Sequence, residues 1–245
     1  MKVSIITVSY NSAASIAKAI ESVLGQTDTE IEYLIIDGNS KDNTVAIAES
    51  YTEAFTQKGI AYHVLSEPDH GIYDAMNKGI KKATGDIIGI LNSDDWYEND
   101  TVEIVRKTFA EEHPDLMFAN IRMHKTDGTT FVKKARIRKY QTSRDWNHPT
   151  TFVKAELYKE FPFKDLGIHD DYGFYLQMTK QGRKIITKDC VLANFRMGGA
   201  SNKKSLKAAK KRIMDRYKYC YRINGYSRLY FLECLAMETA KFILG

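Results

Sequence analysis

Residues 89–100, GILNSDDWYEND, begin as an apolar strand and end in two adjacent carboxylates, Asp94 and Asp95. Neighbouring side chains of a strand point to opposite faces, so a regular strand cannot aim both carboxylates at one ligand. The strand therefore ends near Asn92. Paired carboxylates at a strand end suit a hard divalent cation such as Mg²⁺ or Mn²⁺. A turn that leads into a helix at Thr101 explains the same residues without a metal.

This strand is the last of four apolar strands, expected at residues 3–8, 31–36, 61–65 and 86–91. Helical stripes separate them, at residues 16–24, 45–55 and 72–83. Strands that alternate with helices predict an α/β fold with a mostly parallel, Rossmann-like sheet and helices on both faces. Ligands of such sheets bind beyond the carboxyl ends of the strands. A polar cluster follows each of the four strands, so we expect these clusters to converge.

The second half of the chain is more mixed. A helix is expected at residues 101–111, followed by strand-like segments at 116–123, 129–137, 150–153 and 184–195, with a helix at 171–180. From about residue 201 the chain looks helical and is rich in tyrosine and basic residues, with Asp215 as the single acid between residues 203 and 228. We therefore expect a domain at residues 1–200 and a helical extension at residues 201–245.

Composition narrows the class of protein. The 245 residues are 43% hydrophobic and 27% charged, which is ordinary for a soluble globular chain. Its three cysteines share no metal-binding spacing, and the start MKVSIITVSY is a strand rather than a signal peptide, so we expect a cytoplasmic protein with reduced thiols. The first strand is followed by SYNSAAS, without a glycine-rich phosphate loop, and no Gly-x-Ser-x-Gly elbow occurs. These absences argue against dinucleotide oxidoreductases, P-loop NTPases and α/β-hydrolases.

Two further acidic clusters have competing interpretations. Asp37 can accept a hydrogen bond from a nucleobase, with Gly38 allowing close approach, or it can serve only in a turn. Asp170 and Asp171 open a helix, where carboxylates act as caps. The apolar stripe of that helix fixes it on the core, which is the rigid mounting that a general base requires.

These clusters, in this order, resemble the family 2 glycosyltransferases, inverting enzymes with the GT-A fold. The matching segments are VSIITVSYN (3–11), IIDGNSKDNT (35–44), GIYDAMNKGIKKATGDIIGILNSDDWY (71–97) and HDDYGFYLQM (169–178). EPDHGIYDAMNKG followed by NSDD is similar to a branch that builds bacterial surface polysaccharides, as are NHPTTF (147–152) and NFRMGGAS (194–201). The resemblance covers about residues 1–200.

The resemblance implies a site for a nucleotide-sugar. Asp37 would bind the base, Asp94 would lie near the ribose, Asp95 would bind a Mn²⁺ or Mg²⁺ ion, and Asp171 would be the catalytic base. Many relatives have an acid in place of Asn92. The other residues implied for the donor are Thr7, Val8, Ser9, Tyr10, Asp69, Gly71, Asn77, Asn92 and Ser93.

Three residues are weaker candidates for contact with the acceptor or the diphosphate. Many relatives have Glu in place of Asp170, which leaves Asp170 as an alternative base. His148 is a candidate by its position in NHPTTF, or a structural histidine. Arg196 either approaches the diphosphate or forms a surface salt bridge. Trp96 and Trp146 either stack on sugar or fill the core.

The predicted function is transfer of a sugar, with inversion and metal assistance, to a glycan or lipid-linked acceptor in cell-surface polysaccharide biosynthesis. Uridine is favoured by resemblance alone. One alternative is a nucleotidyltransferase acting on sugar phosphates, although a basic glycine-rich loop is missing after the first strand. The other is a non-catalytic nucleotide or nucleic-acid binding module. Acids at the strand ends would repel phosphates without a metal, so we expect no nucleic acid partner.

The basic tail suggests a further partner. Residues 203–245 interleave tyrosines with Lys and Arg, a composition that suits a membrane surface. We expect peripheral contact with the inner face of the membrane, which would bring the enzyme to a lipid-linked acceptor, or a homodimer contact. The tyrosines are Tyr217, Tyr219, Tyr221, Tyr226 and Tyr230.

Overall fold

The computed structural model describes residues 1–167, 169–198 and 206–244. Its strands are β1 (Val3–Ser9), β2 (Ile31–Asp37), β3 (Ala61–Ser66), β4 (Ile87–Asn92), β5 (Trp96–Tyr97), β6 (Leu116–His124), β7 (Thr130–Lys133), β8 (Phe152–Lys154) and β9 (Ile185–Arg196). Its helices are α1 (Ile16–Leu24), α2 (Thr44–Glu49), α3 (Thr52–Lys58), α4 (Ile72–Lys82), α5 (Thr101–Glu112), α6 (Ala155–Glu160), α7 (Asp170–Lys180), α8 (Leu206–Asp215) and α9 (Tyr230–Leu244).

In this part of the chain all nine strands form one sheet in the order β3-β2-β1-β4-β8-β6-β9-β5, with β7 paired to β6. β1 pairs in parallel with β2 and β4, and β2 with β3. Ser9 lies opposite Asp37, and Asp37 lies opposite Ser66. The carboxyl ends of these strands therefore meet at one edge, as predicted. The other half is mixed, because β8 runs antiparallel to β4 and β6.

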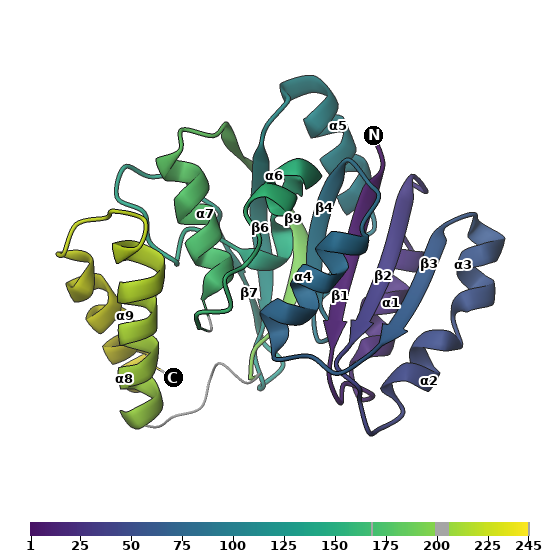
Figure 1. The fold of residues 1–245 in the computed structure, drawn as a ribbon, viewed down its shortest axis with the longest axis horizontal. Helices are drawn as coiled ribbons and strands as arrows, with labels where there is room; N and C mark the ends of the chain where they lie inside the picture. The colour runs from purple at the N-terminus through teal and green to yellow at the C-terminus, as the bar shows by residue number, and fades with distance from the viewer. Residues whose placement is uncertain (168, 199–205, 245) are drawn as a thin grey trace.

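Two hydrophobic clusters cover the two faces of the sheet, because successive strand residues point to opposite sides. On β1, Ile6 and Val8 belong to one cluster, and Val3 and Ile5 to the other. The first cluster includes residues of α4, α6 and α7, and the second includes residues of α1, α3 and α5. Helices therefore lie on both faces, as Figure 1 shows.

The sequence misplaced some elements. The single helix expected at residues 45–55 is two short helices, α2 and α3. The strand expected at 129–137 ends at Lys133, because the residues that follow are largely exposed and bond to a loop, with Arg136 N donating to Asp145 O (2.9 Å). Helix α6 was not expected; it follows β8 directly and buries Leu157 and Tyr158 against the first cluster.

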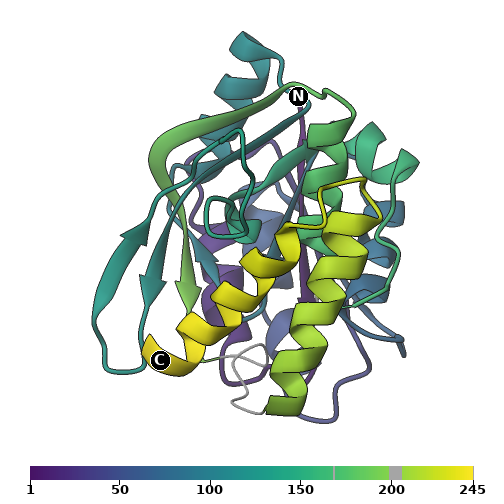
Figure 2. The same ribbon diagram turned by 90° about the vertical axis from the view of Figure 1, so that its left-hand side faces the viewer.

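The tail is helical: the π-helical residues Arg216–Arg222 pack on α7, and α8 and α9 pack against these residues and against each other (Figures 1 and 2). The break expected near residue 225 is present, where Gly225 has φ 72°. Tyr221 and Cys234 are buried in the first cluster, so the tail shares the core of the sheet domain. Residues 199–205, where we expected the domain boundary, lie outside the described residues, and the division into two units stays a prediction. Among the helices described, none is long and apolar enough to cross a membrane.

Candidate active site

The loops after β1 and β2 are tied together at the carboxyl edge of the sheet. Asn11 adopts a left-handed backbone conformation (φ 49°). Its N–H donates to Ser40 Oγ (2.8 Å), and its Oδ1 accepts from Lys41 N (2.8 Å). The N–H of Ser12 donates to Thr44 Oγ1 (2.7 Å). These bonds fix the loop that carries Ser9 and Tyr10 against the loop that follows Asp37.

Asp37 is buried where β1, β2 and β3 end. Its carboxylate accepts hydrogen bonds from Ser9 Oγ (3.0 Å), Ser66 Oγ (2.7 Å), Ser40 N (2.8 Å) and Ser40 Oγ. A carboxylate has about four lone-pair sites, so protein donors use all of them here. Asp37 therefore fastens the three strand ends together. Its predicted contact with a nucleobase requires one serine hydroxyl to turn away, and it stays a prediction.

Gly38, Asp69 and Tyr10 meet at the same edge. A Cβ atom on Gly38 would lie 2.3 Å from Asp69 Oδ2 and 3.4 Å from Tyr10 Cδ2. The missing side chain therefore lets the Asp69 carboxylate approach the backbone of the β2 loop. Asp69 Oδ1 also accepts from Gly71 N (2.9 Å), and Gly71 has φ 131°, a conformation that favours glycine. The ring of Tyr10 is 62% exposed and available to a ligand.

Three of the predicted donor residues have no accessible side chain in this cluster. Thr7 is buried and its Oγ1 accepts from Tyr33 OH (3.0 Å), and the side chain of Val8 is buried, so both can offer a ligand only their backbone. The amide of Asn77 forms two hydrogen bonds with the backbone of Phe163, Nδ2 to O at 2.8 Å and N to Oδ1 at 3.0 Å. Asn77 thus fixes the segment before α7 rather than facing the strand ends.

The predicted metal ligand Asp95 is fully buried at the end of β4. Its Oδ1 accepts from Arg196 N (3.2 Å) and its Oδ2 from Asn92 Nδ2 (3.4 Å), both long contacts for a carboxylate. Burial, followed by repulsion from Asp94, raises the pKa of Asp95 well above its usual value. Burial also raises the pKa of Asp94. Ser93 Oγ donates to Ser12 Oγ (2.8 Å) and joins this turn to the loop after β1.

The residues around Asp95 fit a hard divalent cation. Asn92 Oδ1 is buried and has no hydrogen-bond partner among the described residues. A buried carboxylate with weak donors and an unpartnered amide oxygen are both oxygen ligands of the kind that Mg²⁺ and Mn²⁺ prefer. The described residues contain no group of three or more His, Cys, Asp or Glu that could hold a metal. The chain therefore offers a partial site, and phosphate oxygens of a ligand would complete it.

Two cations stand beside this acidic turn. Arg196 ends β9 with an exposed side chain, and its charge acts on Asp94, Asp95 and Lys18. Burial, followed by repulsion from Arg196, lowers the pKa of Lys18. The Lys18 ammonium lies 3.3 Å from the ring centroid of Trp96, a cation–π contact. Two neighbouring cations repel each other, so an anion such as a diphosphate would stabilise both. This supports Arg196 as a diphosphate contact.

Asp171 is held by three donors at the start of α7. Tyr73 OH (2.9 Å) and Tyr172 N (2.9 Å) donate to its Oδ1, and His148 Nδ1 lies 3.2 Å from its Oδ2. Burial lowers the pKa of His148, although Asp171 partly opposes the shift. His148 is therefore neutral at pH 7 and donates its Nδ1–H to the carboxylate. Its Nε2 is buried without a partner in the described part of the chain.

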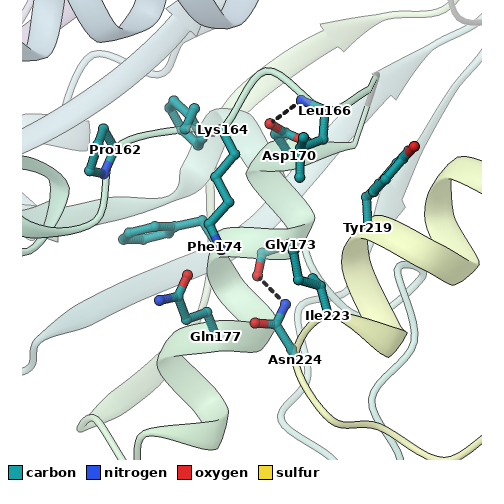
Figure 3. A pocket seen from close by; sticks show the side chains of 11 residues that line it. Pro162, Lys164, Leu166, Asp170, Gly173, Phe174, Gln177, Tyr219, Ile223 and Asn224 are labelled. Carbon is teal, nitrogen blue, oxygen red and sulfur yellow. Dashed lines mark hydrogen bonds between the residues drawn. The ribbon is translucent and has the colours of Figure 1, made fainter.

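Asp170 is turned away from this arrangement. Its Oδ2 accepts from Leu166 N (2.9 Å), and it lines a small pocket between α7 and the tail together with Lys164 and Tyr219 (Figure 3). Burial raises the pKa of Asp170. The two neighbouring carboxylates thus have different surroundings, and only Asp171 has donors from both α4 and the segment around His148.

The pKa values of two buried tyrosines respond to the two acidic centres. Burial raises the pKa of Tyr97, and the charges of Tyr158 and Asp95 add to the shift. Burial likewise raises the pKa of Tyr158, with a contribution from Asp171. The sequence did not single out either residue, nor the role of Tyr73. Tyr97 follows the acidic pair by two residues, which was an available signal, whereas nothing in the sequence marks Tyr158.

Both tryptophans already pack against other side chains. Trp96 packs against Lys18 and His124, with ring centroids of Trp96 and His124 4.6 Å apart. Trp146 is buried and stacks on Tyr175 at 5.8 Å. Trp146 therefore fills the core, whereas stacking of the half-buried Trp96 on a sugar stays a prediction.

Comparison with known proteins assigns the family. The sequence pattern described as Glycosyl transferase family 2 matches residues 4–170, more than half of the chain. The chain belongs to this family. A glycosyltransferase of PGL/p-HBAD biosynthesis from Mycobacterium bovis BCG is 34% identical over 126 residues, which cover 51% of the chain and 48% of that relative. The chain thus spans about half the length of such relatives. An uncharacterised glycosyltransferase of Mycobacterium tuberculosis is 30% identical over 208 residues, 82% of the chain and 77% of that protein.

Solved structures show the same fold. The chain is similar to Staphylococcus aureus TarS in complex with UDP-GlcNAc, with a TM-score of 0.63, 19% identity, and coverage of 99% of the chain and 73% of TarS. It is also similar to the mannosyltransferase PcManGT of Pyrobaculum calidifontis in complex with GDP-Man and Mn²⁺, with a TM-score of 0.65, 17% identity, and coverage of 100% and 76%. The predicted GT-A fold is therefore confirmed.

Proposed function

We propose that the protein transfers a sugar from a nucleoside-diphosphate sugar, a UDP-sugar, to a hydroxyl of a glycan or lipid-linked acceptor, with inversion. The observation that carries the proposal is the anchored carboxylate of Asp171, which has neutral donors on both oxygens. A second acidic centre around Asp95 lies at the end of β4. Family membership favours this reaction over nucleotidyl transfer and over binding without catalysis.

In this reaction Asp171 removes the proton of the acceptor hydroxyl. Tyr73 and His148 hold the carboxylate in one orientation, which is what a general base needs. A single displacement at the anomeric carbon inverts its configuration. It needs one carboxylate for proton transfer, whereas a typical glycosidase needs two. Asp170 is already bonded to Leu166 N and is left out of this step.

The leaving diphosphate carries negative charge that the protein must stabilise. Asp95 and Asn92 Oδ1 would hold a Mn²⁺ or Mg²⁺ ion, which acts as a Lewis acid on the phosphate oxygens when bound. Lys18 and Arg196 stand beside this turn and attract the same phosphates. PcManGT binds GDP-Man and Mn²⁺, which supports a divalent cation in this fold.

We place the nucleoside at the edge formed by Tyr10, Gly38 and Asp69. The exposed ring of Tyr10 suits a flat base, and the lack of a side chain at Gly38 lets a ligand approach the backbone. A uridine nucleotide is supported by TarS, which binds UDP and UDP-GlcNAc. A role in cell-surface polysaccharide biosynthesis is part of the proposal, and the relative from PGL/p-HBAD biosynthesis supports a biosynthetic glycosyltransferase. Cys190, Cys220 and Cys234 are free thiols, which suits the cytoplasm.

The direct test is a panel of nucleotide-sugars assayed for release of nucleoside diphosphate, with a crude extract of glycans and lipid-linked oligosaccharides as acceptor. We expect release of UDP from one UDP-sugar that depends on Mn²⁺ or Mg²⁺ and on the acceptor. If no donor in the panel releases diphosphate above the Asp171→Asn background, the proposed function is wrong.

A further inference from the structure

The solvent-facing side of α9 is apolar at its start, over residues 231–236. Leu232 and Leu235 are 60% and 45% exposed, Phe231 is exposed beside them, and Leu229 in the preceding turn is 72% exposed. A surface helix normally turns its apolar stripe toward the core. Contiguous exposed apolar side chains of this kind mark a surface that binds something.

The inward side of α9 carries a buried ion pair. Glu238 is buried and pairs with Arg212 of α8, with Nη2 2.7 Å from Oε2. Cys234 is buried one turn earlier. The ion pair fixes which side of α9 faces inward, because turning the helix would leave a buried Arg212 without its partner. The outward position of the leucines is therefore imposed by the fold.

A strongly basic segment lies beside α9; it begins in β7, continues beyond the strand, and is called the loop 131–144 below. Residues 131–144 contain no acid, and their basic residues are Lys133, Lys134, Arg136, Arg138, Lys139 and Arg144. The loop contacts the helix, because Arg144 Nε lies 2.8 Å from Met237 Sδ. Ile137 and Tyr140 of this loop are exposed, Tyr140 by 71%. Apolar and basic side chains thus alternate on the loop as well.

The acids near this surface are already engaged. Asp145 pairs with Arg138, with Nε 3.0 Å from Oδ1. Glu233 is half-buried and accepts from Tyr221 OH (3.1 Å). Arg136, Lys139 and Arg228 are exposed, so the surface carries excess positive charge. A surface that combines exposed apolar side chains with excess positive charge is complementary to an anionic lipid surface, where the apolar side chains enter the boundary between headgroups and acyl chains.

We infer that the exposed side of α9 and the loop 131–144 together form a docking face for an anionic lipid bilayer. Of the five tyrosines that suggested membrane contact from the sequence, Tyr221 and Tyr226 are buried and cannot take part, whereas the others are half-buried. The loop leads directly to Trp146 and His148, and Lys133 Nζ donates to Trp146 O (2.8 Å). The docking face is therefore continuous with the segment that holds Asp171.

Because the docking face is continuous with the segment that holds Asp171, we expect the acceptor to be a sugar carried on a lipid and presented at the bilayer surface. The acceptor assignment rests on the proposed function, whereas binding to the bilayer does not. Binding can be measured without any sugar, so the two ideas fail separately.

The test is co-sedimentation of the chain with vesicles of phosphatidylcholine and phosphatidylglycerol, and with vesicles of phosphatidylcholine alone. We expect binding to the anionic vesicles that weakens at high salt. Each basic side chain near an anionic surface strengthens binding about fivefold. The variant Arg136→Gln/Lys139→Gln/Arg228→Gln should therefore bind about 100-fold more weakly.

A matched control removes the same charge elsewhere: Lys81→Gln/Lys82→Gln/Lys107→Gln changes exposed residues of α4 and α5 and should bind like the wild type. The apolar variant Leu232→Ser/Leu235→Ser should lose about tenfold or more. Both docking-face variants should keep the wild-type melting temperature and UDP affinity.

Three results would overturn the inference. If the wild type stays in the supernatant with anionic vesicles, it has no affinity for an anionic bilayer. Equal loss in the basic variant and its matched control would show only a general charge effect. Sedimentation of the wild type as a dimer that Leu232→Ser/Leu235→Ser dissociates would assign the face to a second copy of the chain. Binding to anionic vesicles with no sugar transfer from any donor would preserve the docking face and remove the proposed function.

Discussion

Replacement of Asp95 by Asn should stabilise the protein in the absence of metal while removing its metal-dependent function. Asp95 is fully buried beside Asp94 and has two long hydrogen bonds, so its pKa in the folded chain is well above the usual value. The folded state therefore binds the proton more tightly than the unfolded state. The stability gained from this proton is fully present below the unfolded pKa of about 4, and is lost as pH rises through the folded pKa.

The size of the effect follows from the pKa difference. Each unit between the folded and unfolded pKa values corresponds to about 1.4 kcal/mol of unfolding free energy. In a chain of 245 residues, 1 kcal/mol shifts the melting temperature by about 2–4 °C. Asn keeps the shape of Asp95 and can donate to the unpartnered Asn92 Oδ1 after rotation of that amide. At pH 8 the variant should therefore melt about 3–6 °C higher than the wild type for each pKa unit by which burial raises the pKa of Asp95.

The assay is thermal unfolding of the wild type and Asp95→Asn with a metal chelator present. The pH runs from about 4.5, just above the unfolded pKa of Asp, to about 8. The wild type should lose stability with rising pH more steeply than the variant. Mn²⁺ with UDP should raise the melting temperature of the wild type and leave Asp95→Asn unchanged. Parallel pH profiles for the two proteins would refute the account of a strained, buried carboxylate at this position.

Three further substitutions test other parts of the site. Tyr73→Phe removes one hydrogen-bond donor to Asp171. Because a hydrogen bond to a charged group is worth about 1.5–3 kcal/mol, kcat should fall about 10- to 150-fold, while KM for the nucleotide-sugar stays unchanged. An unchanged kcat would contradict the anchoring role. Gly38→Ala places a Cβ 2.3 Å from Asp69 Oδ2. It should weaken UDP binding, measured by calorimetry, about tenfold, or about 1.4 kcal/mol. Wild-type affinity would show that the edge at Gly38 is not part of the nucleotide site. Gly89→Ala places a Cβ 2.4 Å from Phe152 Cε1 and should cost about 1–3 kcal/mol in denaturant unfolding; a stability equal to wild type would show that the ring moves freely.

The parallel half of the fold was readable from the sequence because its strands are continuous apolar runs between helical stripes. Residues 3–8 and 86–91 are central strands covered on both faces, and such strands carry an unambiguous pattern. The second half was harder. β8 has three residues and β5 has two, and their pairing with β6 and β9 depends on contacts distant in the chain.

In the candidate active site, too, some residues could be predicted from the sequence and others depend on contacts distant in the chain. The carboxylates at the strand ends and at the start of α7 were visible as polar residues in apolar surroundings. Their partners were not, because Tyr73 reaches Asp171 across 98 residues of sequence, and His148 approaches it from another loop. The orientation of α9 was also unreadable. The burial of Glu238 depends on Arg212, and it sends the leucines outward against the usual rule.

The most direct test of the central claim is the turnover of Asp171→Asn beside its neighbour Asp170→Asn. Asn keeps the size of the side chain and removes the base, so Asp171→Asn should bind UDP and Mn²⁺ with wild-type affinity and lose transfer by a factor of about 10²–10⁴. Asp170→Asn should keep most of the transfer activity. In the wild type the Asp170 carboxylate accepts from Leu166 N and lies outside the group formed by Asp171, Tyr73 and His148. Wild-type turnover by Asp171→Asn, or loss of transfer in Asp170→Asn alone, would contradict the assignment of Asp171 as the base.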